Sequence, residues 1–125
     1  PLMPLNIDKH NYLSINDLRL MRRIVRDNRT RATDVGQTIS YWNIVRNGEE
    51  KYIFPFIHQA DVIINTAFAF EVGVIKVFVE PLLYSVKPDN PYYEEAYTLL
   101  YIQMNFAYSI GDYSRVIACI NKFDN

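Results

Sequence analysis

Residues 17–31 read DLRLMRRIVRDNRTR, and this stretch holds six of the eight arginines of the chain within thirteen residues. Apolar side chains recur along it at helical spacing: Leu18, Leu20, Met21, Ile24 and Val25. Arginines follow the same spacing on the other side: Arg19, Arg22, Arg23, Arg26 and Arg29. Ser14 stands three residues before Asp17, which is a variant of the capping box that opens helices. The pattern predicts an amphipathic helix that ends near Arg31, with an apolar seam and an arginine stripe.

The arginine stripe points to a phosphate ligand, because arginine presents a rigid, permanently charged fork that suits phosphate oxygens. The formal net charge of the 125-residue chain is −1. General attraction to nucleic acid or to an anionic membrane is therefore not expected, and any anion site must be local. Half of the residues are hydrophobic and 22% are charged, which is enough apolar material for the core of one domain or a large piece of one.

Other features of the sequence argue against several classes of protein. No apolar run reaches the ~18 residues that a membrane span needs, and the start has no signal-peptide pattern. The single cysteine, Cys119, excludes an internal disulfide and is interpreted as a small buried hydrophobe. His10 and His58 are isolated, so no metal site is expected. We therefore expect a cytoplasmic protein.

A second helix is expected to follow the arginine stretch. Asp34 is placed to cap it, and apolar residues with Trp42 as a core residue carry it to about Val45. Asn47–Gly48 is a turn signal that ends it. Glu49 and Glu50 adjoin this turn and are interpreted as solvated rather than as paired catalytic carboxylates.

The middle of the chain predicts a strand and a helix. Phe56–Gln59 could form a short helix, and the β-branched run Ala60–Asn65 predicts one buried strand. Phe68–Val72 could be strand, whereas Val74–Leu83 is better explained as a helix. The residues expected to face inward from that helix are Val74, Val77, Phe78 and Leu82.

The last third predicts two more helices. Lys87–Pro91 is a linker, and a helix is expected from Tyr92 to about Tyr108. Its inward residues are expected at helical intervals: Ala96, Leu99, Leu100, Gln103 and Phe106. Gly111–Asp112 is a turn signal before a last short helix, 113–123.

A single strand cannot pair with itself. Either Ala60–Asn65 pairs with a hairpin around Phe68, or its partners lie outside the chain. The chain also begins abruptly at Pro1. We therefore favour the second explanation and expect a fragment of a longer protein.

The run Asp17-x-Arg19-Leu20-x-Arg22-Arg23-x-Val25-Arg26-Asp27-x-x-x-Arg31 resembles the lid helix of the uridine kinase family, the P-loop nucleoside kinases related to phosphoribulokinase. Further segments resemble the same family in the same order: Pro4–Asp8, Thr38–Ile39 with Trp42, Val45–Phe56, Ala60–Ala67, and Glu71, Lys76 and Glu80–Leu83 of a bacterial-type C-terminal extension. The resemblance covers about residues 4–125. It implies a kinase that transfers the γ-phosphate of ATP to a nucleoside 5′-hydroxyl, with Mg²⁺ as the second cofactor.

In this resemblance the lid arginines neutralise charge on the transferring phosphoryl group. Arg26 and Arg31 would face the ATP phosphates, and Arg23 would lie between donor and acceptor. These three are the implied catalytic residues. The implied ATP-binding set is Arg19, Arg22, Arg26 and Arg29. Asp27 is expected to pair with a neighbouring arginine and hold it in place.

The sequence departs from the family pattern in several places. Ala32 replaces the usual glycine, and Thr33 and Tyr41 stand where uridine kinases contact the nucleoside through Arg and Gln. The resemblance therefore implies a nucleoside as the substrate class and does not specify which nucleoside. The four glycines also form no Gly-x-x-x-x-Gly-Lys-Ser/Thr loop, which the triphosphate requires.

We thus expect a mostly α-helical C-terminal portion of an α/β P-loop kinase, with one or two β-strands. Residues 1–65 would hold the lid helices and the last core strand, and residues 66–125 a mostly helical extension. The rest of the parent protein would supply most of the ATP and Mg²⁺ binding, so this chain alone is expected to be inactive.

Two other classes of function stay open. The helical tail after Asn65 could mediate assembly, including a homo-oligomer, in a non-catalytic interaction module. The arginine helix could alternatively bind RNA, although the nearly neutral net charge argues against this. The arginine stripe could also have no ligand and form a solvated helix face, in which the arginines pair with Asp17 and Asp27.

Overall fold

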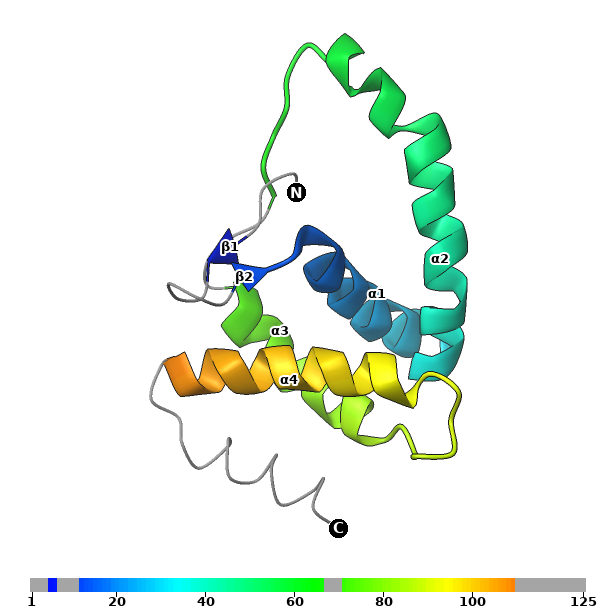
Figure 1. The fold of residues 1–125 in the computed structure, drawn as a ribbon, viewed down its shortest axis with the longest axis vertical. Coiled ribbons are helices and arrows are strands. Elements are labelled where there is room, and N and C mark those ends of the chain that lie inside the picture. Colours follow the sequence, from blue (N-terminus) through cyan, green and yellow to red (C-terminus); the bar gives the residue numbers. More distant parts are fainter. Residues whose placement is uncertain (1–4, 7–11, 67–70, 110–125) are drawn as a thin grey trace.

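The computed structural model describes residues 5–6, 12–66 and 71–109, and these ranges are mostly helical (Figure 1). The elements, in chain order, are β1 (Leu5–Asn6), β2 (Tyr12–Leu13), α1 (Ile15–Arg31), α2 (Val35–Tyr52), the 3₁₀ helix η1 (Phe54–Gln59), α3 (Glu71–Tyr84) and α4 (Tyr93–Ser109). The short strands β1 and β2 pair antiparallel, with Leu5 opposite Leu13.

Helix α1 begins and ends as the sequence predicts. The Ser14 hydroxyl accepts a hydrogen bond from the Asp17 backbone N–H at 3.1 Å and donates one to the Asp17 carboxylate at 2.6 Å. The helix ends at Arg31, and Ala32 adopts a left-handed conformation with φ 51°. The backbone N–H groups of Ala32 and Thr33 both donate to the carbonyl of Asp27, which satisfies the end of the helix.

Helix α2 begins at the predicted cap but continues beyond the predicted end. Asp34 and Gln37 form a capping box. The predicted end near Val45 and the turn at Asn47–Gly48 are wrong, since the helix runs to Tyr52. A glycine inside a helix costs only about 1 kcal/mol. Glu49, which follows it, is buried and binds Arg19 of α1, and this contact offsets the weak local preference for a turn.

The predicted buried strand Ala60–Asn65 is not formed. This segment is extended and exposed, with Val62 and Ile64 each 75% exposed. A strand needs a neighbour to satisfy its backbone groups. Within the described residues the only strand pairing joins β1 to β2, so nothing there pairs with 60–65. The short helix expected at Phe56–Gln59 is present as η1, and it begins two residues earlier.

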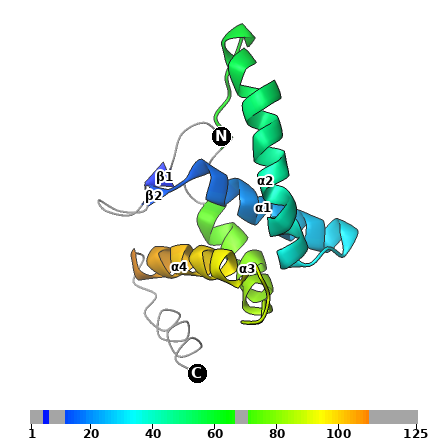
Figure 2. The same ribbon diagram turned by 45° about the vertical axis from the view of Figure 1, so that its right-hand side comes forward.

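The core lies where α1 packs against α2 and α3, and where α3 packs against α4 (Figures 1 and 2). The apolar seam of α1 is buried as predicted, and Trp42 of α2 joins it. Four inward residues of α4 are confirmed: Ala96, Leu99, Leu100 and Gln103. Residues from both sides of position 66 contribute to this one core.

Helix α3 is present, and Leu82 packs against the core as predicted, but the other three predicted inward residues are wrong. Val74, Val77 and Phe78 are 54%, 60% and 48% exposed. The residues that α3 buries are Val72, Ile75, Lys76, Val79 and Leu83. Apolar side chains of α3 point to all sides of the helix, so the periodicity of the sequence could not identify the buried face. Packing against α1 and α4 determines which face is buried.

Several predictions fall outside the described residues. They concern His10, Phe68, Cys119, the turn at Gly111–Asp112 and the helix at 113–123.

The continuation of α2 through Gly48 can be tested by Gly48→Ala. A Cβ at this position meets no heavy atom within 4 Å, so only helix propensity changes. We expect the free energy of unfolding to rise by about 1 kcal/mol in urea titrations. A loss of stability would support a turn at Asn47–Gly48 instead.

The left-handed end of α1 predicts that Ala32→Gly stabilises the chain. Ala32 is exposed, so its methyl group loses no packing, and glycine removes the strain of a positive φ. We expect a gain of about 0.5–1 kcal/mol in the free energy of unfolding. The matched control is Ala60→Gly, at φ −76°, which should show no gain. Equal effects at the two positions would contradict the role of the backbone conformation.

Candidate phosphate-binding site

The first arginine of α1 is bound by an acid from α2. Arg19 Nη1 donates to Glu49 Oε2 at 2.8 Å, and its Nη2 also reaches Glu49 Oε1. The Arg19 guanidinium lies over the ring of Trp42, 5.4 Å from its centroid. Burial lowers the pKa of the Arg19 guanidinium, and the neighbouring arginines, Arg46 first, lower it further. The Arg19 guanidinium is therefore bound at its edge by Glu49 and at its face by Trp42.

The next arginine is bound by an acid from α3. The Arg22 guanidinium donates to both carboxylate oxygens of Glu71, the first residue of α3, and to the carbonyl oxygen of Thr66 at 2.8 Å. The hydrogen bond that Arg22 donates to Glu71 raises the pKa of Arg22, although burial opposes the change. Arg22 thus ties α1 to the segment that enters α3.

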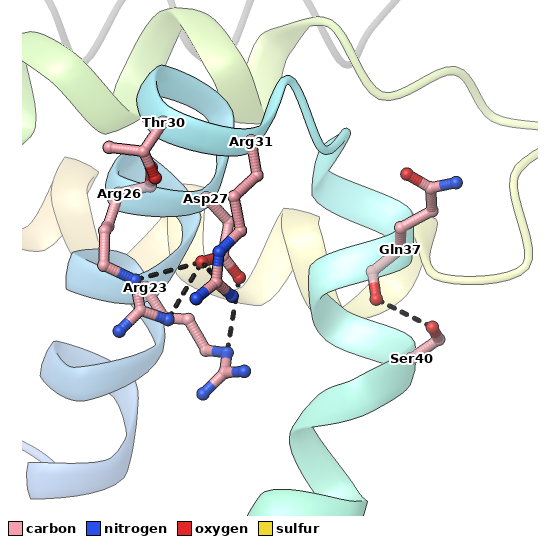
Figure 3. Close-up of polar contacts among 7 residues, drawn as sticks. All are labelled: Arg23, Arg26, Asp27, Thr30, Arg31, Gln37 and Ser40. Carbon is pink, nitrogen blue, oxygen red and sulfur yellow. Dashed lines mark hydrogen bonds and ion pairs between the residues drawn. The ribbon is translucent and has the colours of Figure 1, made fainter.

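Three more arginines of α1 share one buried carboxylate (Figure 3). Asp27, only 4% exposed, accepts from Arg26 Nε at 3.0 Å and from Arg26 Nη2 at 2.9 Å. Its carboxylate also lies 3.4 Å from Arg23 Nε and 3.6 Å from Arg31 Nη1. The predicted pairing of Asp27 with a neighbouring arginine is confirmed. One negative charge meets three positive ones, so this Asp27 cluster carries a surplus of positive charge.

A groove of about 280 Å³ lies between α1 and α2. Four arginines of α1 line it, namely Arg19, Arg22, Arg23 and Arg26, opposite Trp42, Val45 and Glu49 of α2. Arg31 is connected to this group through Asp27. Arg29 lies apart, with its guanidinium 5.8 Å from the ring centroid of Phe78 on α3. The structure therefore brings together five of the six arginines that the sequence singled out.

The arginine-lined groove is suited to binding a polyanion. Guanidinium groups stay protonated, so they stabilise negative charge and do not serve as general bases. Within the described ranges, no group of three or more His, Cys, Asp or Glu residues could hold a metal ion.

A larger apolar cavity of about 520 Å³ lies beside the groove. Arg19 and Glu49 line one side of it, and Ile53, Phe54 and the extended segment line the other.

Sequence reasoning missed the importance of Glu49. It was interpreted as part of a solvated turn, yet it is buried and binds Arg19, thirty positions earlier. No local pattern could reveal this pair, because its two members meet only once α1 and α2 pack together. The available signal was the crowding of α1 with like charges, which requires acids from elsewhere.

One comparison with known proteins gives a match for this chain. The model of the phosphoribulokinase / uridine kinase family matches residues 8–72, more than half of the chain. This chain belongs to that family. Searches of the curated proteins and of the solved structures gave no match. The matched residues of this kinase family member include α1, α2 and the extended segment. None of its described helices has the length and apolar character that would let it cross a membrane.

The Asp27 cluster predicts a salt-dependent loss of stability in Asp27→Asn. Without the carboxylate, the three arginines repel one another, although those that are exposed can turn to water. We expect the free energy of unfolding to fall by about 1–2 kcal/mol at low salt. Because screening weakens repulsion, the deficit should shrink when salt is added. Urea titrations at two salt concentrations measure this, with exposed Asp61→Asn as the control, and a salt-independent deficit would contradict the explanation.

Proposed function

We propose that this chain carries the lid of an ATP-dependent nucleoside kinase, in which the arginines of α1 clamp the ATP phosphates during transfer to a nucleoside 5′-hydroxyl. The observation that carries the proposal is the Asp27 cluster, where one buried carboxylate faces three guanidinium groups. Membership of the phosphoribulokinase / uridine kinase family supports the reaction class. Catalysis of phosphoryl transfer depends mainly on positioning the reactants and on neutralising the charge of the phosphoryl group, and arginines can do both.

The exposure of the arginines supports a division of roles. The side chains of Arg26 and Arg31 are 51% and 60% exposed, so they can reach a ligand without breaking the core. Arg23 lines the groove beside them. We assign the catalytic role to these three. Arg19, Arg22 and Arg29 are weaker candidates for ATP binding, because each has its own partner on another helix. The three arginines of the Asp27 cluster instead share a single carboxylate of their own helix.

ATP and Mg²⁺ need groups that this sequence lacks. It contains no Gly-x-x-x-x-Gly-Lys-Ser/Thr loop, whose backbone N–H groups would cradle the triphosphate. We propose that another part of the parent protein supplies this loop and the Mg²⁺ ligands, and that the chain alone does not catalyse the reaction. When bound, Mg²⁺ would neutralise charge on the phosphates alongside the arginines.

The exposed extended segment supports the proposed organisation. Val62, Ile63 and Ile64 are 75%, 57% and 75% exposed, which suits a strand whose neighbours lie outside this chain. We propose that residues 1–65 contain the lid helices and the last core strand of the kinase domain. Residues 66–125 would then form a helical extension, of which α3 packs against the lid helix α1.

One observation favours a second candidate function, a non-catalytic assembly module. The outer face of α3 exposes Val74, Val77 and Phe78, which are apolar residues suited to contact with another protein or a second copy. Analytical sedimentation of the chain measures its oligomeric state, and self-association would support the assembly module. A strictly monomeric, well-folded chain would remove support for it.

The kinase proposal is tested by Arg26→Ala in the full-length protein that contains this chain. Loss of a group that stabilises transition-state charge should lower kcat for nucleoside phosphorylation by at least ~100-fold. The matched control is Lys51→Ala, which removes an exposed cation from the far end of α2 and should leave kcat unchanged. An unchanged kcat in Arg26→Ala would refute the role of this arginine.

A further inference from the structure

Helices α1 and α2 form a hairpin whose open end is bridged by one ion pair. The helices are joined by residues 32–34, and Arg19 near the start of α1 meets Glu49 near the end of α2. The arginine-lined groove lies along this hairpin, and both members of the pair contribute to its walls. The width of the groove at this end therefore depends on the contact between Arg19 and Glu49.

The bridge has more than one component. The two carboxylate oxygens of Glu49 accept from two nitrogens of Arg19, a bidentate geometry that fixes orientation as well as distance. Trp42, seven residues before Glu49 on α2, lies beneath the Arg19 guanidinium. The side chain of Glu49 is only 11% exposed. Shielding from water makes this contact stronger than a surface ion pair.

The neighbouring acid provides a natural contrast. Glu50 has the same charge and lies on the same helix, but its side chain is 58% exposed, and its Oε1 lies 3.5 Å from Nη2 of Arg46 on the preceding turn. Such an exposed pair contributes little to the fold. Glu49 and Glu50 thus differ in contact and burial while their net charge is identical.

We propose that Glu49 is a positioning residue of the phosphate-binding groove: by holding Arg19 against Trp42, it fixes the separation of α1 and α2, and with it the width of the groove that Arg22, Arg23 and Arg26 line. The proposal rests on the proposed function only in naming a polyphosphate as the ligand. Glu49 touches no ligand in this role, and its effect passes through Arg19.

Two effects of losing this carboxylate have opposite signs. Removing a negative charge beside a cationic groove should strengthen anion binding by simple electrostatics. Loosening the hairpin should weaken it, because Arg19 and the opposite wall of the groove are no longer held and must be ordered by the ligand. If Glu49 positions the groove, the second effect exceeds the first. The direction of the change in affinity therefore separates positioning from charge alone.

The test compares Glu49→Gln with Glu50→Gln in the 125-residue chain, using inorganic triphosphate as the probe in titration calorimetry. We expect Glu49→Gln to bind about three- to tenfold more weakly than the wild type, the effect of losing one charge-assisted contact that holds the site. Glu50→Gln should bind as the wild type does or slightly more tightly. Glu49→Gln binding at least as tightly as Glu50→Gln would overturn the proposal. Arg19→Lys keeps the positive charge but loses the fork, and should weaken binding in the same direction.

Hydrogen exchange of the backbone amides in residues 45–52 provides a second readout that needs no ligand. Glu49→Gln should exchange about tenfold faster there than the wild type, whereas Glu50→Gln should not. If no variant and no wild type binds triphosphate, the proposed phosphate site fails while the exchange experiment still decides the role of Glu49. Unchanged exchange in Glu49→Gln would refute the bridge itself.

Discussion

Repulsion among the arginines of α1 is the constraint around which this structure is arranged. Like charges three and four residues apart destabilise a helix by a few tenths of a kcal/mol per pair, and α1 places six arginines within thirteen residues. Acids from three elements offset this repulsion. Glu49 comes from α2, Glu71 from α3 and Asp27 from α1 itself. The contacts of α1 with its neighbours are therefore ionic on one side and apolar on the other, and both sides fix its position.

The acids do not neutralise the stripe completely. Two arginines have an acid each, whereas Arg23, Arg26 and Arg31 share one. The surplus of positive charge is thus concentrated at the C-terminal half of α1, next to the groove. Since guanidinium groups keep their protons across the physiological range, the strength of this positive charge depends on ionic strength rather than on pH.

What the sequence could predict depends on how far apart the interacting residues lie. The caps Ser14 and Asp34 act within three residues, and both were predicted correctly. The apolar seam of α1 follows from periodicity, and the family follows from the ordered motifs. Failures occurred where a distant contact decides the outcome. The turn signal at Asn47–Gly48 is overridden when Glu49 reaches α1, and the β-branched run at 60–65 has no neighbour among the described residues with which to pair.

The buried face of α3 and the end of α1 show two further limits. An apolar residue on every side of α3 gives no periodicity, so only the packing of α1 and α4 selects Val79 rather than Phe78 for burial. At the end of α1, Ala32 has a positive φ although it carries a Cβ. The left-handed geometry of Ala32 ends α1 and lets the chain turn toward α2, which begins at Val35. The amides that close this turn bond to the carbonyl of Asp27, whose carboxylate holds the arginines. Asp27 thus serves the end of the helix through its backbone carbonyl and the charge of the site through its side chain.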